Sequence, residues 1–124
     1  AAGGGGIPVM EQGSHLKGAS AVIEKDRAAG LLAKELDADV LMFITGVPNV
    51  VLNYGSDHPI NIDKMTTADA ARYAEEGHFK TGSMLPKVES SIDFINAGKG
   101  RRAIITSLDG AKSALAGKGG TTIQ

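Results

Sequence analysis

The chain contains no cysteine and no tryptophan, and aromatic residues make up only 4% of its 124 residues. Without cysteine it has no disulfide, no thiolate catalysis and no thiolate metal ligand, which fits a reducing cytoplasm, where we expect the protein. Because apolar residues still reach 42%, the core has to be built from aliphatic side chains. This length favours a single domain.

The formal net charge is only −1, and no apolar run approaches the roughly 20 residues of a membrane span. We therefore expect neither a nucleic-acid partner nor a membrane. No signal peptide pattern is visible at the start of the chain. The three histidines, His15, His58 and His78, lack the spacing of a metalloprotease helix, so we expect no metal site built from side chains.

Four consecutive glycines occupy residues 3–6 and are followed by Ile7, Pro8 and Val9. Glycine lets the backbone approach another group closely, and consecutive free N–H groups can form an anion-binding loop. Glycines near a chain end are equally typical of a frayed terminus. The motif alone leaves both interpretations open.

Beyond this loop, the pattern predicts helices that alternate with short apolar strands. We expect residues 10–18 to be irregular and residues 19–24 to be a weak extended segment. Asp26 is expected to cap a first helix or to place a negative charge in its first turn, and Thr66 is expected to cap a second helix with Asp69 as its acidic partner. The expected strands are residues 40–45, 50–52 and 102–106, and residues 119–124 are expected to form a final strand or a tail. The expected helices are residues 26–36, 66–76, 86–98 and a short one that starts at Ser107 or Asp109 and ends at Gly117.

This alternation is typical of an α/β fold with a mostly parallel sheet, and the continuous run at 40–45 suits a strand buried on both faces. About three strands are clear, which is few for such a sheet and leaves edges uncovered. We therefore expect the chain to be a piece of a larger domain.

Two lysines stand where ligands bind in open α/β sheets, beyond the carboxyl ends of the strands. Lys25 precedes Asp26 at the start of the first helix, and Lys87 lies in the first turn of another. Free N–H groups and the positive dipole of that helix end suit a phosphate. The residues alone fit either a phosphate clamp or two solvated surface lysines.

A series of motifs gives the chain a resemblance to carbamate kinase, in the order and approximate spacing of that family. The motifs are Ala2 with residues 3–9, Leu16-Lys17-Gly18, residues 21–26, residues 35–39, Asn53-Tyr54-Gly55, Glu76-Gly77-His78-Phe79, residues 82–89 and Gly120-Thr121. Each motif alone is moderately specific, but their succession covers essentially the whole chain.

Carbamate kinases are amino-acid kinases, so the resemblance implies a three-layer α/β/α sandwich with a mostly parallel sheet, and a homodimer. Residues 1–124 resemble only the C-terminal, nucleotide-binding part. The implied activity is a phosphotransferase that interconverts ATP plus carbamate with ADP plus carbamoyl phosphate, at the end of arginine breakdown in fermenting organisms. The implied cofactor is ATP or ADP with Mg²⁺, and the ion arrives with the nucleotide.

The resemblance also implies roles for individual residues. Lys25 and Lys87 would contact the phosphates, and Asp26 would orient Lys25. The site of the carbamoyl or transferring phosphoryl group would be lined by Gly4, Gly5 and Gly6. Nucleotide contacts would come from Thr45, Gly46, Val47, Gly82, Ser83 and Met84. Catalysis would rest on positioning and electrostatics, because carbamate attacks directly.

Two departures from the family pattern bear on activity. The family is more than twice as long, and its first glycine-bearing phosphate loop and another lysine precede the region matched here, so we expect the isolated chain to be inactive. Gly46 stands where the family usually has aspartate. This favours the alternative of a non-catalytic nucleotide-binding or interaction module derived from an amino-acid kinase. A different amino-acid kinase, such as an acetylglutamate or uridylate kinase, is a third interpretation.

Overall fold

A mixed four-stranded sheet forms the centre of the computed structural model, which describes residues 2–124. Its strands lie in the order β3 (Val40–Thr45), β7 (Arg102–Ser107), β8 (Thr121–Ile123) and β6 (Lys64–Met65). The β3–β7 and β6–β8 pairs are parallel and the β7–β8 pair is antiparallel. The expected α/β fold with a mostly parallel sheet is therefore confirmed.

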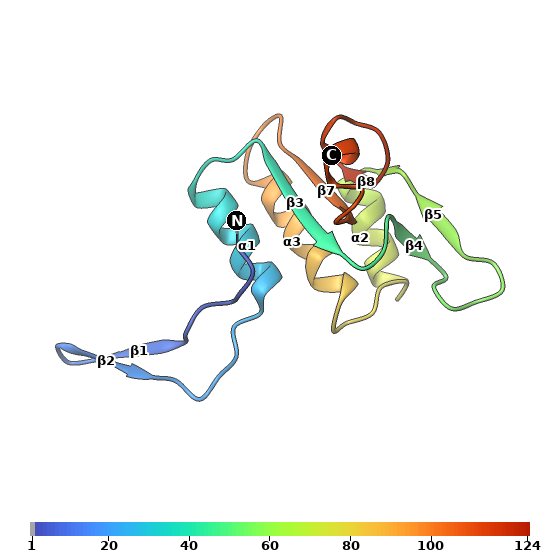
Figure 1. Ribbon diagram of the computed structural model, residues 1–124. Helices are drawn as coiled ribbons and strands as arrows, with labels where there is room; N and C mark the ends of the chain where they lie inside the picture. Colours follow the sequence, from blue (N-terminus) through green and yellow to red (C-terminus); the bar gives the residue numbers. More distant parts are fainter. Residues whose placement is uncertain (1) are drawn as a thin grey trace.

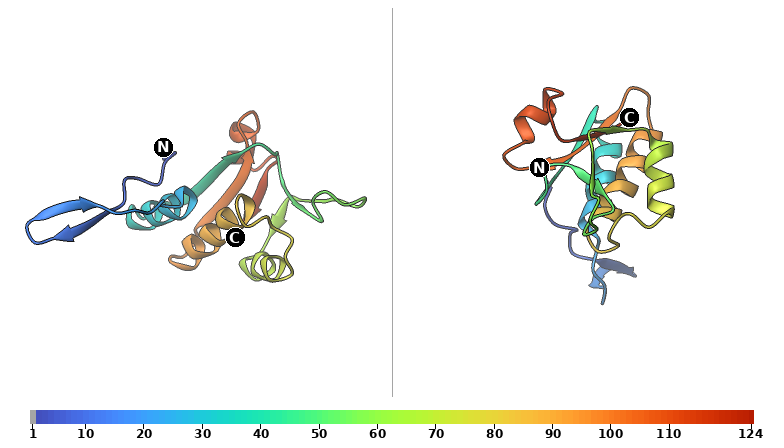
Figure 2. Two further views of the ribbon diagram at one scale, coloured as in Figure 1. Left: turned by 90° about the horizontal axis from the view of Figure 1, so that it is seen from below. Right: turned by 90° about the vertical axis from the view of Figure 1, so that its right-hand side faces the viewer.

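Helices cover both faces of this sheet (Figures 1 and 2). The helices α1 (Lys25–Glu35), α2 (Thr67–Glu75) and α3 (Met84–Asn96) lie on one side of the strands, and the short α4 (Ala111–Leu115) lies on the other. Ala103 and Ile105 of β7 belong to the core beneath the three helices, together with the fully buried Val88 and Phe94 of α3. Ile104 is also fully buried, and strand alternation turns it to the opposite face.

The strand at residues 40–45 has the predicted bounds but not the predicted environment. β3 lies at an edge of the sheet. Leu41 and Phe43 are buried on the face that the helices cover, while Ile44 on the opposite face is 45% exposed. The expectation that both faces of this strand are buried was wrong. Its apolar run does not distinguish a central strand from an edge strand.

Two small antiparallel pairs lie outside the central sheet (Figure 1). β1 (Val9–Gln12) and β2 (His15–Gly18) form a hairpin that stands off the body, and all of its residues are exposed. This corrects the prediction of irregular structure there. β4 (Val50–Leu52), predicted as a strand, pairs with β5 (Ile60–Ile62), which was not predicted. The extended segment predicted at residues 19–24 is not a strand.

Some of the predicted helix caps are present in the structure and others are not. Thr66 caps α2 through a capping box with Asp69, as predicted. The cap of α1 is Glu24, whose carboxylate accepts from the N–H groups of Asp26 and Arg27. Asp26 is therefore not the cap, but it supplies the acidic charge of the first turn, which was its other predicted role. α4 is preceded by Gly110 and not by Ser107 or Asp109. No helix within residues 2–124 is long and apolar enough to cross a membrane.

Candidate functional site

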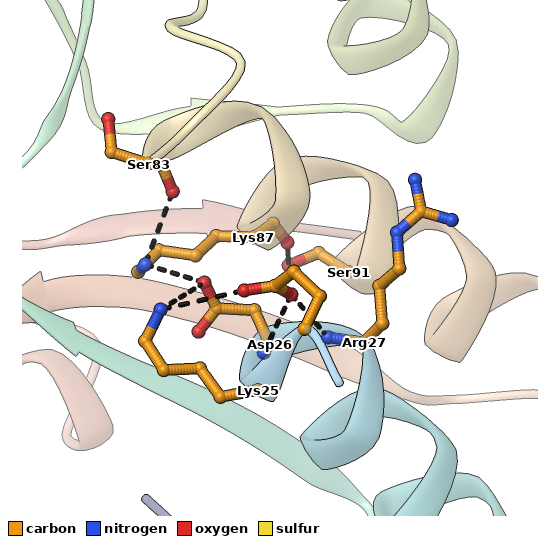
Figure 3. Close-up of polar contacts among 7 residues, drawn as sticks. Lys25, Asp26, Arg27, Ser83, Lys87 and Ser91 are labelled. Atoms are coloured by element: carbon orange, nitrogen blue, oxygen red, sulfur yellow. Dashed lines mark hydrogen bonds and ion pairs between the residues drawn. The ribbon is translucent and has the colours of Figure 1, made fainter. Parts of the chain in front are cut away.

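A buried ion pair joins the start of α1 to the start of α3. The Lys87 ammonium lies 2.8 Å from Asp26 Oδ2, and only 8% of each side chain is exposed (Figure 3). The same ammonium donates to the carbonyl oxygen of Ser83 at 3.2 Å. Lys87 is therefore fixed by two oxygens, and the interpretation of it as an ordinary solvated lysine was wrong.

Lys25 approaches the same carboxylate from the solvent side. Its Nζ lies 3.4 Å from Asp26 Oδ2 and 3.5 Å from Glu24 Oε1, and 52% of its side chain is exposed. The Asp26 carboxylate is the main cause that raises the pKa of Lys25 above its ordinary value, and Glu24 adds a smaller effect against slight desolvation. Lys25 thus stays cationic at neutral pH and keeps freedom to turn toward a ligand.

Close packing of α1 against α3 brings these charges together. A Cβ atom at Gly30 of α1 would lie 3.1 Å from Ser90 Cβ of α3, so the small residue permits the approach of the helices. Arg27 and Glu89 form an ion pair at 2.8 Å across the same contact. Packing of the two helices therefore brings Lys25 and Lys87 to the same Asp26 carboxylate.

A cavity of about 350 Å³ opens where β3 ends, and we call it the strand-end cavity. Its walls come from three parts of the chain: the end of β3 with the residues after it, β4 with the turn after it, and the connection between α2 and α3. Its lining residues are Thr45, Gly46, Val47, Val51, Tyr54, His78, Lys80, Ser83 and Met84. Ser83 belongs both to this lining and to the contacts of Lys87, so the cavity adjoins the ion pair.

The segment after β3, which forms one wall of the cavity, is held by hydrogen bonds to residues in or next to strands β6 and β8. Asn49 Nδ2 donates to the carbonyl oxygen of Gly120 at 2.9 Å and to Asp63 Oδ1 at 3.1 Å. The Val50 N–H donates to Thr121 Oγ1 at 2.8 Å. These bonds fix the path of the chain that carries Gly46 and Val47.

A second cavity of about 400 Å³ lies beside the glycine loop, and we call it the glycine-loop cavity. It is lined by Gly4, Gly5, Val22, Ile23, Glu24 and Lys25. A Cβ atom at Gly5 would lie 2.2 Å from the carbonyl oxygen of Ile23, so only glycine fits there. Gly6 has φ +84° and is not part of this lining.

Most of the predicted site residues fall around these two cavities. Five of the six nucleotide residues line the strand-end cavity, and Gly82 does not. Sequence reasoning assigned no role to Val51, Tyr54, His78 and Lys80, although Tyr54 and His78 stand in motifs that carried the resemblance.

The start of α3 offers fewer free N–H groups than expected. Pro86 has none, and the Leu85 N–H donates to the carbonyl oxygen of Lys80. The Lys87 ammonium, and not a row of amides, is therefore the main positive group at this helix end.

The described residues, 2–124, contain no group of three His, Asp or Glu side chains placed to hold a metal ion. The strand-end cavity also has no carboxylate in its lining. The donor set therefore does not fit a protein cage for Mg²⁺.

Comparison with known proteins relates this arrangement to kinases. The chain is 50% identical over 121 residues to the carbamate kinase-like protein YqeA of Escherichia coli K12, and 49% identical over 123 residues to the carbamate kinase of Thermococcus kodakarensis. These alignments cover 98% and 99% of this chain, but 39% of each relative. The chain thus spans about two fifths of the length of these relatives, which fits the expected part of such an enzyme.

Solved structures show the same relation. The carbamate kinase from Giardia lamblia bound to AMP-PNP superposes with a TM-score of 0.89 at 42% identity, over 96% of this chain and 41% of that one. A uridylate kinase from Archaeoglobus fulgidus shares the fold alone, with a TM-score of 0.62 at 18% identity. A model of the amino acid kinase family matches residues 2–107. The chain therefore belongs to the amino acid kinase family, and its resemblance to carbamate kinase is confirmed.

Proposed function

We propose that the chain is the nucleotide-binding part of a phosphotransferase that interconverts ATP plus carbamate with ADP plus carbamoyl phosphate. The observation that carries the proposal is the buried Asp26–Lys87 pair, joined by Lys25. Lys25 lines the glycine-loop cavity, and Ser83, which holds Lys87, lines the strand-end cavity. Two cavities joined by two lysines suit a donor and an acceptor that exchange a phosphoryl group.

In this mechanism the nucleotide occupies the strand-end cavity, and the carbamoyl or phosphoryl group lies beside Gly4 and Gly5. A carbamate oxygen forms a bond to the γ-phosphorus while the bond from that phosphorus to the ADP oxygen breaks, and the reverse reaction makes ATP. Lys25 and Lys87 neutralise negative charge on the transferring group, and Asp26 holds both ammonium groups in position. No side chain acts as nucleophile or base.

The proposal extends to the partners expected from the resemblance. Mg²⁺ would arrive on the nucleotide phosphates and supply further positive charge there. The whole protein would act as a homodimer in the cytoplasm, at the end of arginine breakdown. The similarity to a carbamate kinase bound to AMP-PNP supports the nucleotide assignment.

A substrate panel tests the proposed reaction. Full-length protein is mixed with ADP and carbamoyl phosphate, and ATP formation is measured beside reactions of ATP with acetylglutamate and with UMP. We expect turnover in the reaction of ADP with carbamoyl phosphate and in neither of the other two reactions. Turnover with one of the other substrates would assign the chain to a different amino-acid kinase activity and would contradict the proposal.

Gly46 favours a second candidate, a nucleotide-binding module without catalysis, because the family pattern places a carboxylate there. The site has room for one: a Cβ atom at Gly46 would have no neighbour within 4 Å, and its backbone lies outside the left-handed region. This candidate expects the full-length protein to bind ADP without turnover in either direction.

Replacement of Gly46 separates the two candidates. If the missing carboxylate limits activity, Gly46→Asp raises ATP formation about tenfold or more, while Gly46→Asn, of the same size but uncharged, does not. Equal rates for wild type and both variants, all well above background, would show that the position is not limiting and would leave the kinase assignment standing.

A further inference from the structure

Lys80 places an ammonium group at the rim of the strand-end cavity. The residue is exposed and lies in the connection between α2 and α3, and its Nζ is 5.0 Å from the centroid of the Tyr54 ring. Tyr54 belongs to the turn after β4, and both residues line the cavity. The cation–π contact therefore joins two separate connections across the rim.

The charge on Lys80 is not neutralised by neighbouring protein groups. The lining contains no aspartate or glutamate. Over residues 2–124, no carboxylate lies within ion-pair distance of Lys80. His78, the other basic side chain of the lining, lies 3.2 Å from Glu76, and Lys87 is not part of this lining. Lys80 thus gives the lining a permanent positive charge that has no carboxylate partner there and can contact a ligand.

The backbone of Lys80 is anchored next to the ion-pair cluster. Its carbonyl oxygen accepts from the Ser83 N–H at 3.2 Å and from the Leu85 N–H at 3.0 Å. An exposed cation–π contact is weak, and a contact between an ammonium and a phosphate oxygen is stronger. A negatively charged ligand can therefore draw the flexible side chain away from Tyr54 while its backbone stays in place.

We propose that Lys80 makes the strand-end cavity selective for nucleoside phosphates over nucleosides, by exchanging its contact with Tyr54 for a contact with a phosphate oxygen. The inference rests on the proposed nucleotide-binding role of this cavity and adds the residue that distinguishes a charged ligand from an uncharged one. Tyr54 holds the ammonium over the rim, so the side chain is ordered before the exchange.

Calorimetric titration of full-length protein with ADP and with adenosine tests this role. Lys80→Met is compared with wild type, with the conservative Lys80→Arg, and with Lys112→Met, which removes an exposed lysine of α4. We expect Lys80→Met to weaken ADP binding about fivefold and to leave adenosine binding unchanged. Lys80→Arg and Lys112→Met should bind ADP as wild type does.

The contrary outcomes separate this inference from the proposed function. If wild type binds ADP but Lys80→Met binds it equally well, or weakens ADP and adenosine by the same factor, only the role of Lys80 is overturned. If wild type binds neither ligand, both the nucleotide assignment and the role of Lys80 are overturned.

Discussion

Asp26 and Lys87 are 61 positions apart in the chain, yet they form the most buried ion pair of the described residues. Removing two charges from water costs several kcal/mol, and their attraction recovers this only with good geometry and further hydrogen bonds. Here the ammonium has a second oxygen partner at Ser83. Such a pair adds little net stability, and we interpret it as a device that holds a fixed cation beside the cavity.

Removal of one partner should therefore be much more costly than removal of both. We predict that Lys87→Met lowers the free energy of unfolding by about 3–5 kcal/mol, because it leaves the Asp26 carboxylate buried without its cation. The double variant Asp26→Asn with Lys87→Met should lose clearly less than the sum of the two single losses. Urea unfolding of full-length protein is measured for wild type, the two single variants and the double variant. Additive losses in the free energy of unfolding would contradict a coupled pair.

The proximity of the three charged residues at the start of α1 and α3 was predictable from the sequence, but their burial was not. The resemblance placed Lys25, Asp26 and Lys87 in one site. The burial of Lys87 depends on the packing of α1 on α3, which no local pattern of residues encodes. The contact of Lys80 with Tyr54 was not predictable for the same reason, since the two residues belong to different connections.

At the scale of elements, the best predicted feature is the start of α2. The Thr66 hydroxyl accepts from the Asp69 N–H at 3.1 Å, and Asp69 accepts in return from Thr66. Hydrogen bonds from Thr66, and then from Arg72, lower the pKa of Asp69 below its ordinary value. The folded state thus favours the charged form of Asp69 over the protonated form.

This shift predicts the sign of a pH effect on stability. Because the folded pKa of Asp69 is the lower one, its contribution is fully present above the unfolded pKa, about 3.9, and is lost as pH falls through the folded value. Asp69→Asn should therefore be less stable than wild type at pH 7, and the difference should shrink toward acid pH. Thermal unfolding between pH 7 and pH 3 measures this. A constant or growing difference at low pH would contradict the role of the carboxylate.

The least predictable element is the β1–β2 hairpin. Its residues are exposed on both faces, so no alternation of buried and exposed positions marks it in the sequence. Its turn depends on Gly13 at φ +62°, a single residue in a polar stretch. Elements that pack against the core leave a stronger pattern, and β7, predicted at residues 102–106, ends only one residue later.

At the scale of the whole molecule, a large apolar surface stays uncovered. A groove between the N-terminal arm and α1 carries Val22 at 95% exposure, Ile7 at 87% and Leu31 at 55%. Isolated exposed side chains are ordinary, but a contiguous apolar groove is an interaction surface. The sequence predicted uncovered sheet edges from the small number of strands, but it did not predict this apolar groove on α1.

The 124-residue chain, produced by itself, should therefore associate and should not catalyse. We expect it to bind a hydrophobic dye and to elute with a mass above 12.7 kDa in light-scattering chromatography. We also expect no ATP from ADP and carbamoyl phosphate, because the chain spans only about two fifths of the length of the relatives that it matches. A dye-free monomer, or measurable ATP formation, would contradict this part of the account.

In the proposed mechanism Lys25 acts on the transferring phosphoryl group. The rate of ATP formation from ADP and carbamoyl phosphate by full-length protein tests this most directly. Lys25 is half-exposed, so Lys25→Met should fold as wild type does, and Lys112→Met is a matched control on α4. We predict that Lys25→Met lowers kcat about hundredfold while Lys112→Met leaves it unchanged. A Lys25→Met enzyme with the kcat of wild type would contradict the account.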